Sequence, residues 1–378
     1  MLAFSRCIPL AALLLVAAAC SSSEQDADPS AAPSAAPSAA PAPSGSAGAI
    51  AAKVSTAPSP PPPPPAPPPP LPDEDLYPDT LEEQREALFR RMAVMLELSD
   101  DQMSAVRGVF ERSSHLGQGN PKVTQHPVTR KQCREKRAEA GVVDEDKAMC
   151  GGRFMVPLYD PTVGEKEEDA RACIDRFEFP GIPCEHPVVY PSAREAAELC
   201  AAVGKRLCDA HEWEGACAGA VHAPEGEYTF DRARKEAKNL HNRDREIVWA
   251  YGREKNHAAC GTTSRKTEGC TSSGWKRCGT NSFPAGSFPG CKSPLGVYDQ
   301  HGNVAEHMNL PLSSDELASR GGKGWTEMKG SWFIFANLEA HEDDCRWRAP
   351  DWHATKISDP QSHGNYHLGF RCCKTIEK

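Results

Sequence analysis

Cysteine is the residue type in this chain that could do the most chemistry, since it can form disulfides, bind metals or act as a nucleophile. The chain has 16 cysteines among 378 residues. Cys7 and Cys20 belong to an apolar leader, and the other fourteen are spread from Cys133 to Cys373. Thiols in such number favour disulfides formed in an oxidising compartment. Zinc thiolates are the alternative, but such sites typically use paired C-x-x-C knuckles, and the sequence has none.

The 13 histidines are the second set of chemically capable residues. Four of them, His341, His353, His363 and His367, gather in the C-terminal part, but no H-x-x-H or H-E-x-x-H pair occurs. We therefore interpret the histidines as surface or hydrogen-bonded residues. A ligand-binding group around a cleft is the alternative.

The charge and hydropathy of the chain exclude two broad classes of protein. A net charge of -9 leaves no basic footprint, so we expect no nucleic-acid partner. No apolar run of about 18 residues occurs beyond the extreme N-terminus, which excludes a polytopic membrane protein.

Residues 1–20 predict a secretion signal. Arg6 supplies a positive charge, residues 8–19 form a short apolar core, and small residues lead into Cys20 and a polar stretch. This pattern resembles a bacterial lipoprotein signal, in which Cys20 would be lipidated and become the mature N-terminus. We expect a lipid anchor in the bacterial cell envelope, at the outer membrane or the periplasmic face. An ordinary secretory signal cleaved nearby is the alternative.

Residues 21–75 predict a spacer. They consist largely of alanine, proline and serine, and 17 of the chain's 34 prolines fall between residues 21 and 72. Such a composition has little apolar bulk to bury, so we expect a disordered or polyproline II linker.

Residues 76–149 predict a helical hairpin followed by a connecting segment. Thr80 with Glu83 forms a capping-box pattern, and Ser99 opens a second helix whose apolar residues also share one face. We interpret the apolar faces as packing surfaces, with a binding groove as the alternative. The charged run 130–137 (RKQCREKR) is expected to be a solvated face.

Residues 150–378 predict the principal domain, which is rich in loops, aromatic residues and cysteines. Ser192 with Glu195 forms another capping box, leading to a helix that Gly204 can end. Asp209 starts a further helix, which ends near Gly219. Because regular elements are few, we expect disulfides to hold much of this domain together.

Four separated blocks of this domain suggest a family. They are CIDRFE at 173–178 with EAAELCAAVGKRLCDAHEWEGAC at 195–217, GVYDQHGNVAE at 296–306, KGSW at 329–332 with RWR at 346–348, and GFRC at 369–372. In this order they resemble the sulfatase-modifying factor family, whose founding member is the formylglycine-generating enzyme. The resemblance implies a compact, irregular and disulfide-rich α+β fold of the C-type-lectin type.

The family's enzyme uses oxygen to convert a substrate cysteine to formylglycine, with two reactive cysteines that bind copper. The corresponding positions here are Ile334 and Asp344, and Cys345 is the one cysteine between Trp332 and Gly369. One thiol cannot provide the bis-thiolate site that suits Cu(I). We therefore expect neither catalytic residues nor copper, and we predict a binding or structural module. The alternative is an oxidoreductase that matures sulfatases, or a diverged enzyme of the family.

The resemblance also implies two structural features. It pairs Cys200 with Cys372 and Cys217 with Cys345 in disulfides. It places a calcium ion on Asp299, Gly302, Val304 and Glu306, where two carboxylates flank a glycine that permits a tight loop. A loop held by ordinary carboxylate hydrogen bonds is the alternative to calcium.

We expect the remnant cleft to hold an extracytoplasmic protein or a glycan of unknown identity. Four tryptophans lie near the former active-site segment and could line a groove: Trp325, Trp332, Trp347 and Trp352. An aromatic core is the preferred interpretation of these four residues.

Overall fold

The computed structural model describes residues 78–227, 229–272, 274–310, 324–350 and 353–377. The expected signal, Cys20 and the linker 21–75 lie outside the described residues. Of the helices that are described, none is long and apolar enough to cross a membrane.

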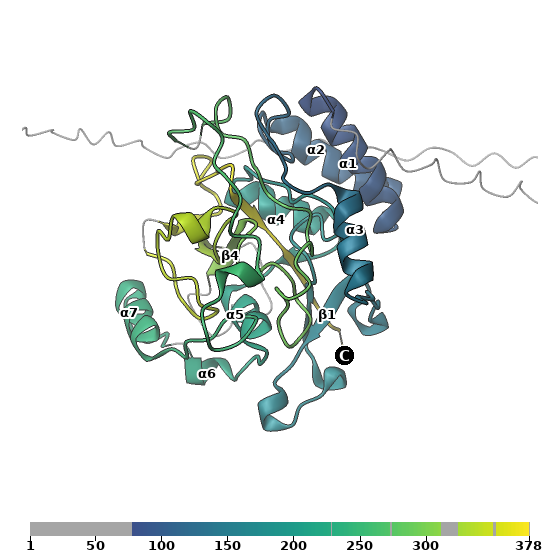
Figure 1. Cartoon of the computed structure of the whole chain (residues 1–378). Coiled ribbons are helices and arrows are strands. Elements are labelled where there is room, and N and C mark those ends of the chain that lie inside the picture. The colour runs from purple at the N-terminus through teal and green to yellow at the C-terminus, as the bar shows by residue number, and fades with distance from the viewer. Residues whose placement is uncertain (1–77, 228, 273, 311–323, 351–352, 378) are drawn as a thin grey trace, which may run out of the picture. The chain divides into compact units, whose positions relative to one another are not determined.

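The predicted helical hairpin is confirmed as α1 (Leu81–Met95) and α2 (Asp100–Arg112). Thr80 and Ser99 cap the two helices, each in a reciprocal capping box. The two helices pack through Phe89 and Phe110, whose rings meet edge to face at 5.0 Å. Their apolar faces join one buried cluster with helix α4 (Ala193–Ala202), so the hairpin packs on the main domain (Figure 1).

The charged run 130–137 was expected to be a solvated face. This prediction is confirmed for Lys131, Gln132 and residues 134–136, which are exposed, but it is wrong for Arg130, Cys133 and Arg137, which are buried. The run forms α3 (Arg130–Glu139), in which Arg130 and Arg137 are each only 5% exposed. Arg130 pairs with Glu185, and Arg137 pairs with Asp144. Burial is possible because each guanidinium has a carboxylate partner, and both partners lie outside the run.

Two small sheets form the centre of the domain. The first has the antiparallel order β1 (Met155–Leu158), β2 (Ala172–Asp175), β8 (Cys372–Thr375) and β3 (Arg206–Leu207). The second has the order β6 (Thr355–Lys356), β5 (Trp325–Lys329), β4 (Ala305–Leu310) and β7 (Leu368–Phe370), with β4 and β7 parallel. The C-terminal strands β7 and β8 therefore join different sheets and tie them together.

The two helices predicted for the main domain are confirmed. Ser192 caps α4, and Gly204 follows its end with a positive φ of 74°. Asp209 caps α5 (Ala210–Ala218), which ends at Gly219 with a φ of 90°. The remaining helices are α6 (Pro224–Glu227), α7 (Arg234–Asp244) and the 3-10 turns η1 (Ala148–Cys150), η2 (Pro161–Val163), η3 (Glu167–Asp169), η4 (His257–Ala259) and η6 (Phe335–Asn337).

Seven disulfides close all fourteen cysteines of the described residues. The pairs are Cys133–Cys184, Cys150–Cys173, Cys200–Cys372, Cys208–Cys373, Cys217–Cys345, Cys260–Cys291 and Cys270–Cys278. Three of them join positions 128, 165 and 172 residues apart. Because cross-links over such long loops restrict the unfolded chain most, each contributes on the order of 2–5 kcal/mol.

Candidate functional site

Ile334 and Asp344, the two positions that the resemblance relates to the family's copper ligands, are buried side chains. Ile334 packs in an apolar cluster with Trp332, Phe333 and Phe335. The Asp344 carboxylate accepts three hydrogen bonds from Arg245, at 2.7 to 3.1 Å. A carboxylate that is buried and bound by a guanidinium is already neutralised, so it is a poor ligand for a soft cation.

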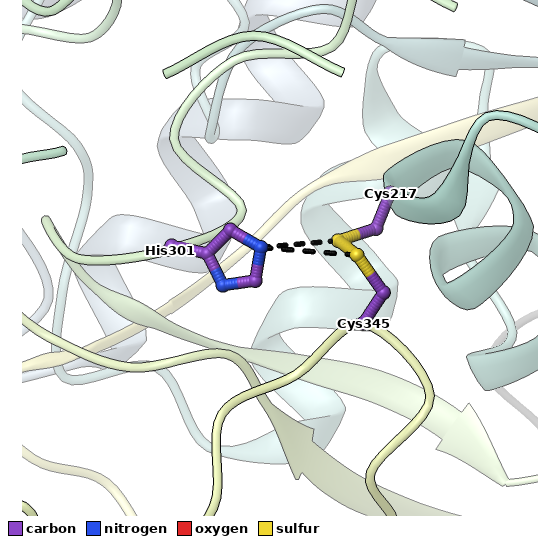
Figure 2. A group of neighbouring side chains, drawn as sticks. All are labelled: Cys217, His301 and Cys345. Atoms are coloured by element: carbon purple, nitrogen blue, oxygen red, sulfur yellow. Dashed lines mark hydrogen bonds between the residues drawn. A yellow bond between two sulfur atoms is a disulfide. The ribbon is translucent and has the colours of Figure 1, made fainter. Parts of the chain in front are cut away.

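A disulfide lies directly beside Asp344. Cys345 is bonded to Cys217 of α5, and the His301 ring points at this bond (Figure 2). His301 Nε2 lies 3.3 Å from Cys217 Sγ and 3.8 Å from Cys345 Sγ. The resemblance implied this cysteine pair. Sequence reasoning missed the histidine, because its approach to the two sulfurs depends on contacts over 44 and 84 residues.

Cys217, His301 and Cys345 are residue types that bind metals, but their ligand atoms already have other partners. The ligand atoms lie within 4.8 Å of one another. Thiolates bind metal, however, and here both sulfurs are used by the disulfide. His301 Nε2 accepts a hydrogen bond from the Ala250 backbone N–H at 3.0 Å, so its lone pair is also used. In this oxidised form, His301 packs against the disulfide, and the three residues have no free ligand atom facing one another.

The loop expected to hold calcium is tight and acidic. Asp299, Gly302 and Asn303 have positive φ values of 58°, 76° and 50°. The Asp299 carboxylate accepts the Gly286 backbone N–H, and Glu306 binds the Arg371 guanidinium through both oxygens, at 2.7 and 2.6 Å.

Glu178 adds a third buried carboxylate to this loop. It accepts hydrogen bonds from the Asn303 side chain and the Val304 backbone N–H. Burial raises the pKa of Asp299 to about 6, and burial together with the neighbouring carboxylates holds the pKa of Glu178 well above its ordinary value. Of the three buried carboxylates, Glu306 is bound by the Arg371 guanidinium, so the negative charge of the three exceeds the positive charge of Arg371. A cation that prefers oxygen ligands would fit this site in charge and in donor type. Calcium stays a prediction, in which the ion would share Glu306 with Arg371.

The tryptophans and histidines near the former active-site segment form an aromatic stack. Trp332 stacks on His367 at 4.6 Å, and His341 stacks on Trp347 at 4.4 Å. Trp332 and Trp347 are buried, which favours the interpretation as aromatic core, whereas Trp325 is half-buried. Trp352 lies outside the described residues. Among the described residues, no three histidines bring their ligand atoms within 4.8 Å of one another.

Fold and site together define a class: a disulfide-rich α+β domain with two small sheets, in which a buried disulfide and His301 lie beside Asp344. Residues 122–376 match the sulfatase-modifying factor enzyme 1-like domain, so the chain belongs to that family. The match includes α3, which precedes the expected start of the domain at residue 150.

Among solved structures, the chain is similar to a crystal structure of CarF. The similarity has a TM-score of 0.31 at 14% identity and covers 59% of this chain and 98% of that chain. No curated protein sequence matches the chain.

Proposed function

We propose that this protein is an extracytoplasmic binding or structural module rather than an oxidase. The observation that carries the proposal is the state of the cysteines. Ile334 and Asp344 occupy the positions of the family's copper ligands, and all fourteen described cysteines are in disulfides. Without two thiolates, the described residues offer no soft site for the metal that would activate oxygen.

One observation favours the alternative of a rearranged oxidoreductase. The Cys217–Cys345 disulfide lies next to Asp344, and its reduction would release two thiols at this place. Both sulfurs are buried, however, and thiol exchange requires access for the attacking thiolate.

Copper titration with a turnover assay separates the two functions. The unreduced full-length protein is titrated with Cu(I) and then incubated with oxygen and a Cys-x-Pro-x-Arg peptide. We expect no stoichiometric copper and no formylglycine. The positive control for copper is the double variant Ile334→Cys with Asp344→Cys. Stoichiometric copper together with product in the wild-type protein would overturn the proposal.

We propose an extracytoplasmic protein or a glycan as the ligand, bound at the aromatic stack. His341 and His367 are half-buried residues that stack on the buried Trp347 and Trp332, and His341 Nε2 and His367 Nδ1 have no hydrogen-bond partner among the described residues. Replacing both histidines by alanine should abolish binding to a glycan array or a surface-protein panel while leaving the melting temperature within a few degrees. A hit that survives the double replacement would place the ligand elsewhere.

We propose that Cys20 carries a lipid anchor in the bacterial cell envelope and that residues 21–75 act as the spacer. The proposal is supported by the small residues before Cys20 and by the composition of the linker. Replacing Cys20 by serine should move the protein from the membrane fraction to the soluble fraction. An unchanged distribution would contradict the anchor.

We propose Ca²⁺ as a structural ion at Asp299, Gly302, Val304 and Glu306. Calcium should raise the melting temperature of the wild-type protein relative to a chelator. Asp299→Asn should remove this response, because it deletes the charge while keeping an oxygen that accepts the Gly286 N–H. The exposed Asp231→Asn is the matched control. Equal melting temperatures with calcium and with chelator would reject the ion.

A further inference from the structure

A cavity of about 500 Å³ lies between the 159–171 loop and the segment from α5 to α6. It is separate from the surroundings of Ile334, Asp344 and His301, which we call the remnant site. We call the cavity the loop–helix pocket. Val221 N–H donates to Tyr159 C=O at 3.2 Å and joins its two walls. The volume is within the range of small-molecule sites, and neither Ile334, Asp344 nor His301 lines it.

The wall of the loop–helix pocket has an apolar part. Leu158 and Ala172 are buried within it. Val163 also lines the pocket and is 73% exposed, which makes it one of the most exposed large apolar side chains described. An aliphatic group of a ligand that packs on Val163 would remove apolar area from water, and this burial would stabilise the complex.

A histidine–aspartate pair gives the pocket a directional polar group. His222 Nδ1 lies 2.7 Å from the Asp160 carboxylate, which also accepts two hydrogen bonds from Thr162. Burial alone would raise the pKa of Asp160, but these hydrogen bonds outweigh it and lower the pKa, so the carboxylate is ionised. A carboxylate can only accept, so His222 Nδ1 donates in this contact, and when the ring holds a single proton its Nε2 is left as an acceptor.

The charge of the lining is negative. Its carboxylates are Asp160, Glu165, Asp169, Glu212 and Glu225, and its basic side chains besides His222 are Arg171 and His211. Two of these residues are neutralised from outside the lining, because Glu212 pairs with Arg206 and His211 pairs with Glu227. The acids that remain outnumber Arg171, which favours a cationic ligand.

We propose that the loop–helix pocket binds a lysine-like ligand, an alkylammonium group on an aliphatic stem. The ammonium donates to His222 Nε2 and is held by the rim carboxylates Glu165 and Glu225, while the stem packs on Leu158 and Val163. The same chemistry is offered by a free amine and by a lysine side chain of a protein partner. The pocket is separate from the remnant site, so this proposal stands or falls independently of the loss of oxidase activity.

Calorimetric titration of the full-length protein tests the pocket with two pairs of probes. The first pair is N-acetyl-lysine methylamide and its norleucine analogue, and the second is a capped pentapeptide with lysine or norleucine at its centre. The lysine form should bind about tenfold or more tightly, since a charge-assisted hydrogen bond contributes on this order. Higher salt should weaken its binding. Tighter binding of the peptide than of the amide points to a protein partner, and equal binding points to a free amine.

Pocket variants make the assignment specific. His222→Gln and Glu225→Gln should each weaken the lysine probe several-fold, and Ala223→Phe should block the cavity. All three are partly or fully exposed positions, which favours intact folding. Glu254→Gln, an exposed carboxylate outside the pocket, should change nothing. Equal affinity for the lysine and norleucine probes, absence of binding by both at millimolar concentration, or equal effects of Glu225→Gln and Glu254→Gln would overturn the proposal.

Discussion

Asp344 is a buried carboxylate whose charge is balanced by three hydrogen bonds from Arg245. Its spacing from the RWR motif predicts that it stands at a copper position of the family, where a carboxylate argues against a thiolate site. The ion pair with Arg245 compensates the cost of burying this carboxylate. The two residues are 99 positions apart, so no local sequence pattern indicates their contact. The same limit applied to His301, whose neighbours in the sequence say nothing about the disulfide it meets.

A second residue, His211, gives a pH dependence. Burial alone would lower its pKa, but the hydrogen bond to Glu227 and the surrounding carboxylate charge outweigh burial and raise the pKa to about 9, from its ordinary value of 6.5. Because the folded state holds the proton more tightly, the stabilisation is fully present below about pH 6.5 and is lost as the pH rises through 9.

The matching prediction compares wild type with His211→Gln. Between pH 6.5 and 9 the free energy of unfolding of the wild type should fall by roughly 2–3 kcal/mol more than that of the variant. Denaturant unfolding at a series of pH values, with disulfides intact, measures the difference. Parallel pH profiles for the two proteins would show that the ion pair with Glu227 does not form in solution.

At the scale of elements, local signals were reliable and long-range pairing was not. The capping boxes at Thr80, Ser99 and Ser192 correctly located three helix starts, because a cap is a contact within four residues. The run 130–137 is a solvated face for most of its length, but the burial of Arg130 was missed because it depends on Glu185, which lies 55 residues away in the sequence. Sheet order could not be derived either, since β8 pairs with β2 and β3 across most of the domain.

The Glu185 carboxylate pairs with Arg91 of α1 and with Arg130 of α3, so replacing Glu185 tests how much these ion pairs contribute to stability. This carboxylate is buried between Arg91 and Arg130, and it also accepts a hydrogen bond from Gln118 at 2.6 Å. Glu185→Leu should lower the free energy of unfolding by about 3–5 kcal/mol, because it removes the carboxylate that pairs with two buried guanidinium groups.

Two further proteins act as controls for this prediction. Glu198→Ala breaks the exposed pair with Arg112 and should cost less than about 1 kcal/mol. Combining Glu185→Leu with Arg91→Met and Arg130→Met should recover much of the loss, since no unpaired charge remains. Equal destabilisation by Glu185→Leu and Glu198→Ala would contradict the buried network.

At the scale of the whole molecule, the cysteines decide between architecture and redox chemistry. Their even number predicted disulfides, and the family resemblance implied Cys200–Cys372 and Cys217–Cys345, the same two pairs that the structure joins. The other five pairs could not be chosen from the sequence, because composition does not fix connectivity. Every described cysteine is paired, and residues 122–376 match the family's domain, which supports the proposal of an architectural role for the cysteines.

The most direct measurement of this account is a map of free thiols. The purified full-length protein is unfolded without reductant, alkylated, digested and analysed by mass spectrometry. The account predicts no alkylated cysteine between Cys133 and Cys373 and predicts cross-linked peptides for the seven pairs. Alkylation of Cys217 and Cys345 in the native preparation, with the other pairs intact, would reveal a thiol pair beside Asp344 and contradict the central claim.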